Sequence, residues 1–541
     1  MGVNVSEVFG QNVFDESVMK NRLPEATYNE IKKIMHEGGD ITMDIANIVA
    51  QAMKEWAVEK GATHYTHVFQ PYIISVGAEK HDSFASLPTD GKIDNTFTGK
   101  EWGDGTEDEA IFNPVKMDAD QWCDALCAAG MKGLILTCKH HDGFCLWPSR
   151  YTTHTVAASS YRDGKGDIVK EVSEACKRHG LDFGIYLSPW DRNNYLYGQG
   201  KPYDDYFVNQ LTELLTQYGP IFAVWFDGAC GEGPNGKKQY YDWERYYEVI
   251  RRLQPNACIH VCGPDVRWCG NEAGSTRESE WSVVPLRTRD TEKIQENSQK
   301  QDDTQFRERI VRASDQDLGS YELIKDEKEL IWYPAEVNTS IRPGWFYHEE
   351  EDDQVKSLET LISIYEHSVG GNATFLLNIP PTKEGLFHEN DVKRLHEIGE
   401  YKKKCYGKNL LEKASLFCEE QKKGFEIENV RNDDYDSYFT TLDGQRNCRI
   451  HIKFDKEYDI HRVILKENIK KSQRIEAFRI LTVHDGSEKC IFEGTVVGYK
   501  KIALLDEIKT KELVKELVKE LVIEIIDSRV APTLSYIGIF E

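Results

Sequence analysis

Side chains suited to acid–base chemistry follow several short apolar segments in the middle of the chain. His140 and His141 follow LILTC, and Tyr186 lies within FGIYLS. Asp227 follows FAVWF, and Glu272 lies in a glycine-containing loop after CIHVCG. Glycosidic cleavage needs two carboxyl groups, one that attacks the sugar or activates water and one that protonates the leaving oxygen. With the imidazoles and aromatic rings nearby, these residues predict a pocket for a sugar.

Each of these residues also has a simpler interpretation. An aspartate after a strand is often the N-cap of the next helix, and two histidines can be half of a metal site. A zinc site would need further ligands at suitable spacing, and the sequence has no HxH or HExxH pattern. We therefore expect no metal ion and no organic cofactor. Carboxyl groups about 5–5.5 Å apart imply retention and about 6.5–9.5 Å inversion, which sequence spacing leaves open.

The elements that must position these residues alternate between helix and strand from about residue 118. Four helical patterns are each followed by a nearly continuous apolar run, as expected for parallel strands covered by helices. These runs are KGLILTC, LDFGIYLS, IFAVWF and ACIHVCG. A later helix, QVKSLETLISIYEHSVGG, precedes a similar run, ATFLLNIPP. Such repetition favours a (β/α) barrel, whose functional residues lie at the carboxyl ends of the strands.

Other patterns flank this region. Residues 24–60 predict two helices, and the charged stretch 400–409 is typical of a linker. Residues 410–541 alternate polar and apolar side chains, which predicts antiparallel strands in a β-sandwich. Within it, KELVKELVKELV at 511–522 has the four-residue spacing of a helix. We interpret that repeat as a local duplication that protrudes at an edge of the sandwich.

Composition excludes several classes of function. Lys and Arg total 67 against 91 Asp and Glu in 541 residues, a net charge of −24. Because phosphate neutralisation supplies most nucleic-acid affinity, we expect no nucleic-acid partner. No apolar run approaches the roughly 18 residues of a membrane span, and the first residues lack a secretory pattern. The thirteen cysteines have no paired CxxC spacing, so a reducing, cytoplasmic location is expected. No pattern indicates an oligomeric state.

Longer motifs carry a resemblance to a known family. They are EWGDGTEDEAIFNP, LTCKHHDGFCLWPSRYTTH, GIYLSPWDR, VWFDGACGEGPNG, GPDVRWCGNEAG and WYPAEVNTSIRPGWFYH. Over about residues 95–541 the chain resembles the α-L-fucosidases of glycoside hydrolase family 29, most of all the subgroup that acts on α-1,3/1,4-linked fucose. The resemblance implies a barrel resembling a TIM barrel, followed by a discoidin-like β-sandwich. It also implies a retaining exo-glycosidase that releases α-L-fucose from oligosaccharides or glycoconjugates.

The resemblance also implies roles for individual residues. Asp227 matches the nucleophile, and Glu272 matches the general acid/base of the subgroup. Their separation of 272 − 227 = 45 residues suits adjacent barrel strands. His140 and His141 match the pair that hydrogen-bonds fucose hydroxyls. The further segments that resemble parts of the sugar pocket contain Glu101, Trp102, Tyr186, Arg267 and Trp345.

The resemblance breaks near the front of the barrel. Family members have a first strand that ends in a histidine-containing motif, and Gly91 stands where that histidine is expected. Residues 7–93 instead resemble the N-terminal region of type III glutamine synthetases, which predicts a joint near residue 93. A barrel without its native first strand would leave two strands with unpaired edges. The segment ATHYTHVF could fill that place with His64 or His67, but its register was never matched to this barrel.

The sequence therefore predicts three parts. They are a glutamine-synthetase-like segment at 1–93, a (β/α)-barrel catalytic domain at 94–400 and a carbohydrate-binding-like β-sandwich at 410–541. An active α-L-fucosidase acting on fucosylated glycans is the first hypothesis. The alternative is a catalytically impaired fusion protein that retains only carbohydrate binding.

Overall fold

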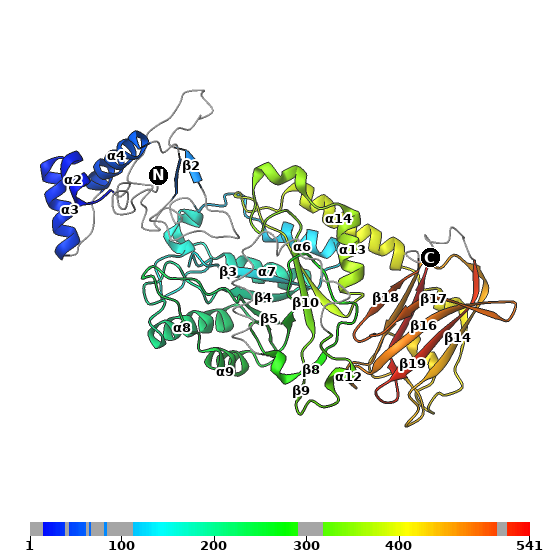
Figure 1. The fold of residues 1–541 in the computed structure, drawn as a ribbon. Helices are drawn as coiled ribbons and strands as arrows, with labels where there is room; N and C mark the ends of the chain where they lie inside the picture. The colour runs from blue at the N-terminus through cyan, green and yellow to red at the C-terminus, as the bar shows by residue number, and fades with distance from the viewer. Residues whose placement is uncertain are drawn as a thin grey trace, which may run out of the picture.

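A barrel of parallel strands occupies the middle of the protein, with a β-domain after it and a helical segment before it (Figure 1). The structure is a computed structural model. It describes residues 14–37, 43–60, 64–66, 81–83, 112–289, 317–505 and 517–541. Glu101, Trp102 and Gly91 lie outside these residues.

The barrel strands form two parallel sheets whose order follows the chain. The first sheet has the order β3-β4-β5-β6 and the second the order β7-β10-β11. Their bounds are Gly133–Lys139 for β3, Asp182–Leu187 for β4, Ala223–Phe226 for β5, Cys258–Val261 for β6, Arg267–Trp268 for β7, Ala335–Ser340 for β10 and Ala373–Asn378 for β11. A parallel bridge between His260 and Val266 links the two sheets. Among the described residues, β3 and β11 are the outermost strands of this series.

Amphipathic helices pack outside these strands, as the alternating pattern predicts. They are α6 (Ala119–Ala128), α7 (Ile168–His179), α8 (Lys201–Gln217), α9 (Trp243–Leu253), α13 (Leu358–Ser368) and α14 (Glu389–Tyr406). Local signals set their ends: Asp167 caps α7 by accepting from the Lys170 N–H at 2.9 Å. Gly180 ends the same helix with a φ of 69°, a left-handed conformation that costs glycine little. The buried faces of these helices share one large apolar core with the strands.

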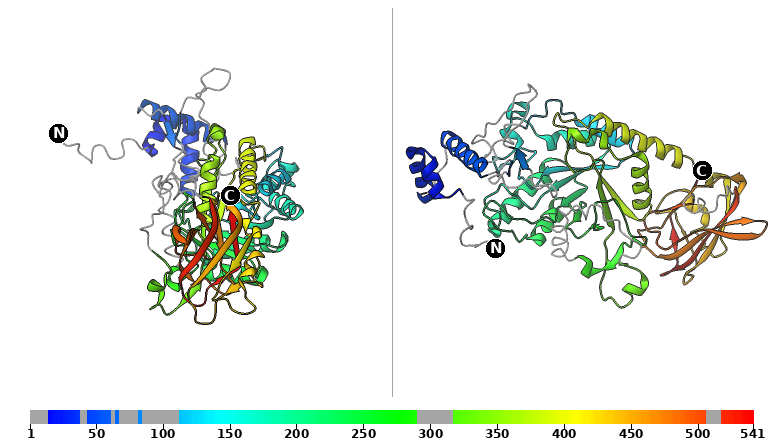
Figure 2. Two further views of the ribbon diagram at one scale, coloured as in Figure 1. Left: turned by 90° about the vertical axis from the view of Figure 1, so that its right-hand side faces the viewer. Right: turned by 45° about the horizontal axis from the view of Figure 1, so that its top comes forward.

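The C-terminal β-domain consists of two antiparallel sheets around a second core. The five-stranded sheet has the order β12 (Ala414–Phe417), β14 (Cys448–Tyr458), β19 (Val518–Ser528), β16 (Ile475–His484) and β17 (Ser487–Gly494). The three-stranded sheet has the order β18 (Lys501–Leu504), β15 (Arg462–Lys466) and β21 (Tyr536–Phe540). A short pair, β13 (Phe439–Thr440) with β20 (Thr533–Leu534), completes it. Figure 2 shows this domain end-on in its left view.

Two predictions about this half of the chain are wrong. The stretch 400–409 is largely not a linker, because α14 continues through it to Tyr406. The helix joins the two domains: Tyr406 donates to Glu366 on α13 at 2.6 Å, and Glu366 also pairs with Arg462 of β15 at 2.8 Å. The last KELV repeat does not protrude at an edge either, since β19 begins at Val518 and lies between β14 and β16. Residues 511–516 lie outside the described residues.

The N-terminal helices have a small core of their own. They are α2 (Glu16–Arg22), α3 (Glu25–Glu37) and α4 (Met43–Glu59), and they pack through Leu23, Ile31 and Val49. The predicted helices within 24–60 are thus confirmed. Strand β1 (His64–Thr66) pairs antiparallel with β2 (His81–Ser83) in a separate two-stranded sheet rather than with a barrel strand.

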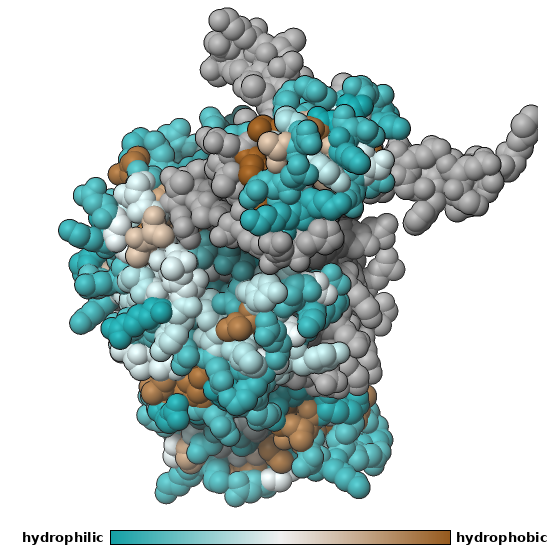
Figure 3. All heavy atoms as spheres, turned by 90° about the vertical axis from the view of Figure 1, so that its left-hand side faces the viewer, coloured by the Kyte–Doolittle hydropathy of each residue, from teal (hydrophilic) through white to brown (hydrophobic). Residues whose placement is uncertain are grey.

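The surface agrees with the strongly acidic composition. On the face that carries the N-terminal helices, hydrophilic residues predominate and hydrophobic ones form small separate groups (Figure 3). Within the described part of the chain, no helix is long and apolar enough to traverse a lipid bilayer. All thirteen cysteines are free thiols.

The β-domain contains a buried carboxyl group that couples stability to pH. Glu467, after β15, is fully buried and accepts the N–H groups of Gly498 at 2.7 Å, Arg474 at 2.7 Å and Ile475 at 3.0 Å. These donors favour the charged form, but burial outweighs them and raises the pKa of Glu467 from 4.5 to about 7.

This shift predicts that the free energy of unfolding falls as the pH rises from about 4.5 to about 7. In that window the folded state holds a proton that the unfolded state has released, and a shift of this size corresponds to about 3 kcal/mol. Chemical denaturation of the wild type and of Glu467→Gln across this range and above pH 7 provides the measurement. The difference between the two proteins should change with pH below 7 and be constant above it; a difference independent of pH would contradict the prediction.

Candidate active site

A large cavity opens where the barrel strands end. Its volume is about 1220 Å³. The residues predicted from strand ends that line it are His140, His141, Tyr186, Asp227, Glu272 and Trp345. The cavity also extends down the barrel interior between β3 and β11, where residues 133–137 and 374–378 line it.

Asp227 directly follows β5 and is held by two donors. Tyr186, on the neighbouring strand β4, donates its hydroxyl to Oδ2 at 2.8 Å, and the backbone N–H of Ala229 donates to Oδ1 at 2.8 Å. Burial and the adjacent Asp227 charge raise the pKa of Tyr186 well above its usual value, so the phenol keeps its proton. The Asp227 side chain remains 22% exposed. It is therefore oriented by hydrogen bonds and still accessible from the cavity.

His141 presents a neutral imidazole beside this carboxylate. Its Nδ1 lies 2.6 Å from Ser188 Oγ, and Ser188 donates its one proton to the carbonyl of Trp190 at 2.7 Å. Ser188 must then accept from Nδ1–H, which leaves a lone pair on Nε2, 3.8 Å from Asp227 Oδ2. Burial, reinforced by the Arg192 and Lys139 cations, lowers the pKa of His141 to about 3. Nε2 is thus placed to accept a hydrogen bond from a hydroxyl group in the cavity.

His140 forms part of an aromatic wall. Its ring stacks on Tyr186 with centroids 5.7 Å apart and planes 9° apart, and the edge of Phe346 approaches at 5.2 Å. Burial and the neighbouring His141 lower the pKa of His140 well below its ordinary value. The two imidazoles are therefore both neutral near pH 7, as hydrogen-bonding groups for sugar hydroxyls can be.

A buried ion pair fixes the loops on which these residues depend. Lys139, at the end of β3, lies 3.0 Å from Asp191 and donates to Gln210 at 2.9 Å. Asp191 in turn accepts the N–H groups of Asn193 and Asn194 at 3.0 and 2.8 Å. Because both charges are fully buried, removing either partner would leave the other uncompensated.

Glu272 faces the same cavity from the other sheet. It lies in the loop after β7, and its Oε2 accepts the indole N–H of Trp345 at 3.2 Å. The expectation that Asp227 and Glu272 follow adjacent strands is wrong, because β6 lies between β5 and β7. The cavity nevertheless brings both carboxyl groups to one space.

The remaining predicted residues divide into two groups. Arg267 lies on β7 but is buried in an ion pair with Glu280, with further bonds to the carbonyls of Tyr333 at 3.0 Å and Trp281 at 2.7 Å. It is not among the residues that line the cavity. Glu101 and Trp102 lie outside the described residues, so their place in the pocket stays a prediction.

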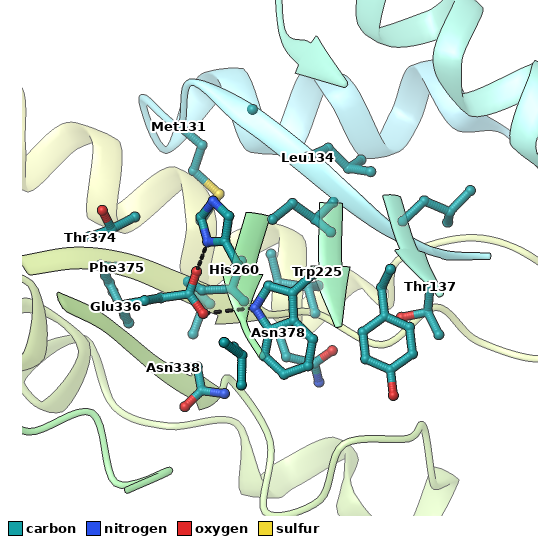
Figure 4. A pocket seen from close by; sticks show the side chains of 18 of the residues that line it. Met131, Leu134, Thr137, Trp225, His260, Glu336, Asn338, Thr374, Phe375 and Asn378 are labelled. Carbon is teal, nitrogen blue, oxygen red and sulfur yellow. Dashed lines mark hydrogen bonds and ion pairs between the residues drawn. The ribbon is translucent and has the colours of Figure 1, made fainter. Parts of the chain in front are cut away.

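Several cavity residues were missed by sequence reasoning. The cavity interior contains Trp225, His260, Glu336 and Asn338 (Figure 4). For Glu336 and Asn338 the signal was the alternation of polar residues in AEVNTS, which is β10, a strand too polar to be recognised by its apolar character.

One group of side chains has the composition of a metal site. Ligand atoms of His140, His141 and Asp227 all lie within 4.8 Å of one another. Structural zinc sites have four protein ligands and catalytic ones have three with an open position. These three residues could thus hold a cation, although they equally form the hydrogen-bonding wall described above.

Carboxyl groups that enter one cavity at the carboxyl ends of barrel strands, beside neutral imidazoles and indoles, define a glycoside hydrolase. Comparisons with known proteins specify the family. A sequence model of α-L-fucosidase matches residues 92–407. The chain is 37% identical to α-L-fucosidase 1 of Arabidopsis thaliana over 455 residues, which cover 82% of this chain and 83% of the relative. The chain belongs to the α-L-fucosidase family.

Solved structures agree with this assignment. A glycoside hydrolase family 29 fucosidase of Ruminococcus gnavus in complex with fucose superimposes with a TM-score of 0.66 at 27% identity. That match covers 81% of this chain and 91% of the other. The barrel with a C-terminal β-domain is therefore the architecture of this family.

The front of the chain matches another family. A model of the N-terminal region of type III glutamine synthetase matches residues 5–115. The type-3 glutamine synthetase of Dictyostelium discoideum is 37% identical over 109 residues, which are 20% of this chain and 15% of that protein. The chain thus joins parts similar to two families, as the sequence motifs predicted.

Proposed function

We propose that this α-L-fucosidase is a retaining exo-glycosidase in which Asp227 is the nucleophile and Glu272 the general acid/base. The observation that carries the proposal is that both carboxyl groups line one cavity with His140, His141 and Tyr186. The substrate we propose is a glycan with a terminal α-1,3- or α-1,4-linked fucose. This linkage is proposed because the motif around Glu272 resembles that of the subgroup that acts on α-1,3/1,4-linked fucose.

In the first step, an Asp227 carboxylate oxygen bonds to the anomeric carbon as the bond to the leaving oxygen breaks. Glu272 gives its proton to that oxygen, so the aglycone leaves as an alcohol. In the second step, Glu272 removes a proton from water, and the water oxygen replaces Asp227 at the anomeric carbon. Two inversions at one carbon retain its configuration.

The surroundings of each carboxyl group support this division of roles. Tyr186 and the Ala229 N–H donate to the two carboxylate oxygens of Asp227, which orients the group proposed as the nucleophile. Glu272 accepts the indole N–H of Trp345, and in this proposal a negative Asp227 in the same cavity favours its protonated form. The neutral imidazoles of His140 and His141 supply hydrogen bonds to the sugar and do not take the proton that Glu272 transfers.

Other proposed contributors act around this centre. Trp345 positions Glu272 and provides an apolar surface, and Glu101 and Trp102 are proposed to contact fucose. Arg267 is proposed to support the site from outside the cavity, through its buried ion pair with Glu280. We further propose the division into residues 1–93, 94–400 and a discoidin-like domain at 410–541, with α14 bridging the last two.

Substitution of the two carboxyl groups should separate their roles. Asp227→Ala should abolish release of fucose from every substrate, because no nucleophile remains. Glu272→Ala should keep a larger share of activity on an aryl fucoside with an acidic leaving group than on a fucosylated oligosaccharide, because the former departs without a proton. We expect losses on the order of a thousandfold or more for the oligosaccharide, measured by fucose release.

The anomer formed first completes that test. Proton NMR of the wild-type reaction should show α-fucose before mutarotation, and β-fucose would contradict retention. Folded wild-type protein that releases no fucose, yet gains thermal stability from fucose, would instead favour the impaired fusion that only binds carbohydrate.

We also propose that the described barrel lacks one strand, between β3 and β11. Seven parallel strands run in order from β3 round to β11, and residues 133–137 and 374–378 of these two line the cavity. Thr137 and Thr374 are exposed, although barrel strands are usually buried on both faces. By contrast, β4 is buried from Phe183 to Leu187.

Native-state hydrogen exchange tests this proposal. Amides in 133–137 and 374–378 should exchange on the order of tenfold or more faster than those in 183–187. The reason is that, among the described strands, β3 and β11 each have a backbone partner on one side only, whereas β4 has one on both sides. Equal protection of the three segments would show that another part of the chain completes the ring.

A further inference from the structure

The interior side of β10 is a row of polar residues below the two carboxylates. Glu336, Asn338 and Ser340 alternate along the strand, so their side chains share one face. All three are at least 95% buried. A strand of a barrel normally fills the interior with branched apolar side chains, so this polar row requires an explanation.

Each member of the row is connected to a tryptophan. Glu336 accepts the Trp225 indole N–H at 2.8 Å, and Asn338 accepts that of Trp268 at 2.9 Å. Ser340 accepts from the Asn378 amide at 2.9 Å, and the same amide donates to the carbonyl of Trp345 at 2.9 Å. The strand thus orients the indoles of Trp225 and Trp268 and, through Asn378, holds the backbone of Trp345.

Glu336 contacts side chains of two other strands. Its second oxygen, Oε2, lies 2.6 Å from His260 Nδ1, so one carboxylate joins β10 to both β5 and β6 (Figure 4). Trp225 and His260 are directly opposite each other in the pairing of β5 with β6. The carboxylate of Glu336 therefore connects β10 with β5 and β6 across the barrel interior.

Trp225 connects Glu336 with the residues around Asp227. Its ring stacks on Tyr186 with centroids 5.2 Å apart and planes 23° apart, and the two residues are opposite each other in the pairing of β4 with β5. Tyr186 donates to Asp227 at 2.8 Å. Trp225 lies on β5 and Asp227 directly follows this strand. Because the two residues are two positions apart, their side chains point to the same face.

We propose that Glu336 is a positioning residue that holds Asp227 through Trp225 and Tyr186. Trp225 is half-buried at the wall of a large cavity, where an indole without an N–H acceptor can rotate into the open space. Rotation removes the stack under Tyr186 and lets its hydroxyl drift from Asp227. The inference rests on the proposed role of Asp227.

A double-mutant cycle tests the connection. Glu336→Met removes the acceptor at similar length, and Trp225→Phe removes the indole N–H while keeping a stacking ring. Each should lower kcat on the order of ten- to a hundredfold with KM changed by less than about threefold, as a displaced reacting group does. The double variant should be no slower than the slower single one, because both break one connection. If the fold losses in kcat of the two single variants multiply in the double variant, the proposal is wrong.

Two further variants separate positioning from general stability. Glu336→Gln keeps an acceptor for Trp225 and should restore most of the kcat lost in Glu336→Met. Glu213→Met is the matched control, since Glu213 is a buried glutamate that accepts the indole N–H of Trp147 at 2.9 Å, and neither residue lines the cavity. It should lower Tm without lowering kcat. An equal loss of kcat in this control would also overturn the proposal.

A binding measurement distinguishes this inference from the proposed function. If the wild type does not release fucose, the proposed function fails, and the same cycle is measured on the Kd of a cationic iminosugar analogue of fucose. Its ring ammonium would pair with Asp227. The double variant should bind the analogue no more weakly than the weaker single variant. If the fold increases in Kd of the single variants multiply in the double variant, the connection is contradicted independently of turnover.

Discussion

The alternation of side chains along paired parallel strands determines the whole site. Tyr186, Trp225 and His260 are opposite one another on β4, β5 and β6, so their side chains enter the interior at one level. Asp227 follows Trp225 by two residues and enters one level higher. A shift of register by one residue would point each of these groups at the outer helices instead. Strand pairing therefore sets which groups can meet.

Burial then determines the charge of each group. The imidazoles of His140 and His141 have lost enough hydration to stay neutral, and Arg192 and Lys139 reinforce this for His141. The one fully buried cation at the end of β3, Lys139, is compensated by Asp191. A phenol and a backbone N–H donate to the carboxyl group of Asp227 next to the cavity. Neutral imidazoles beside the carboxyl groups of Asp227 and Glu272 suit a substrate that is polar and uncharged.

Much of this arrangement could be predicted from the sequence. Apolar runs identified β3, β4, β5, β6 and β11, and the strand-end rule identified both carboxyl groups and both histidines. The polar strand β10 was not predicted because the partners of its polar side chains lie on other strands, which no local pattern reveals. Strand β7 was not predicted because the sequence does not indicate where β6 ends. It ends at Val261 with a φ of 64°, a conformation that a β-branched residue rarely adopts.

The errors have similar causes. The charged residues of 400–406 were read as a linker, yet their aromatic neighbours Tyr401 and Tyr406 dock the β-domain and keep the segment helical. The KELV repeat has helical spacing, but pairing with β14 and β16 on both sides overrides that preference at 518–522. Arg267 was expected in the pocket because it follows a predicted strand and lies in a segment that resembles part of the family's sugar pocket, whereas the buried Glu280 pairs with it away from the cavity.

The central claim is that Asp227 bonds covalently to fucose within a cavity shared with Glu272. It is tested most directly by incubating the protein with an activated 2-fluoro-fucoside, whose fluorine slows hydrolysis of the ester, and by mass spectrometry of the digested protein. We predict a mass increase of one fluorofucosyl group on the peptide that contains Asp227. Attachment to a different residue, or turnover of ordinary fucosides with no trapped ester at all, would contradict it.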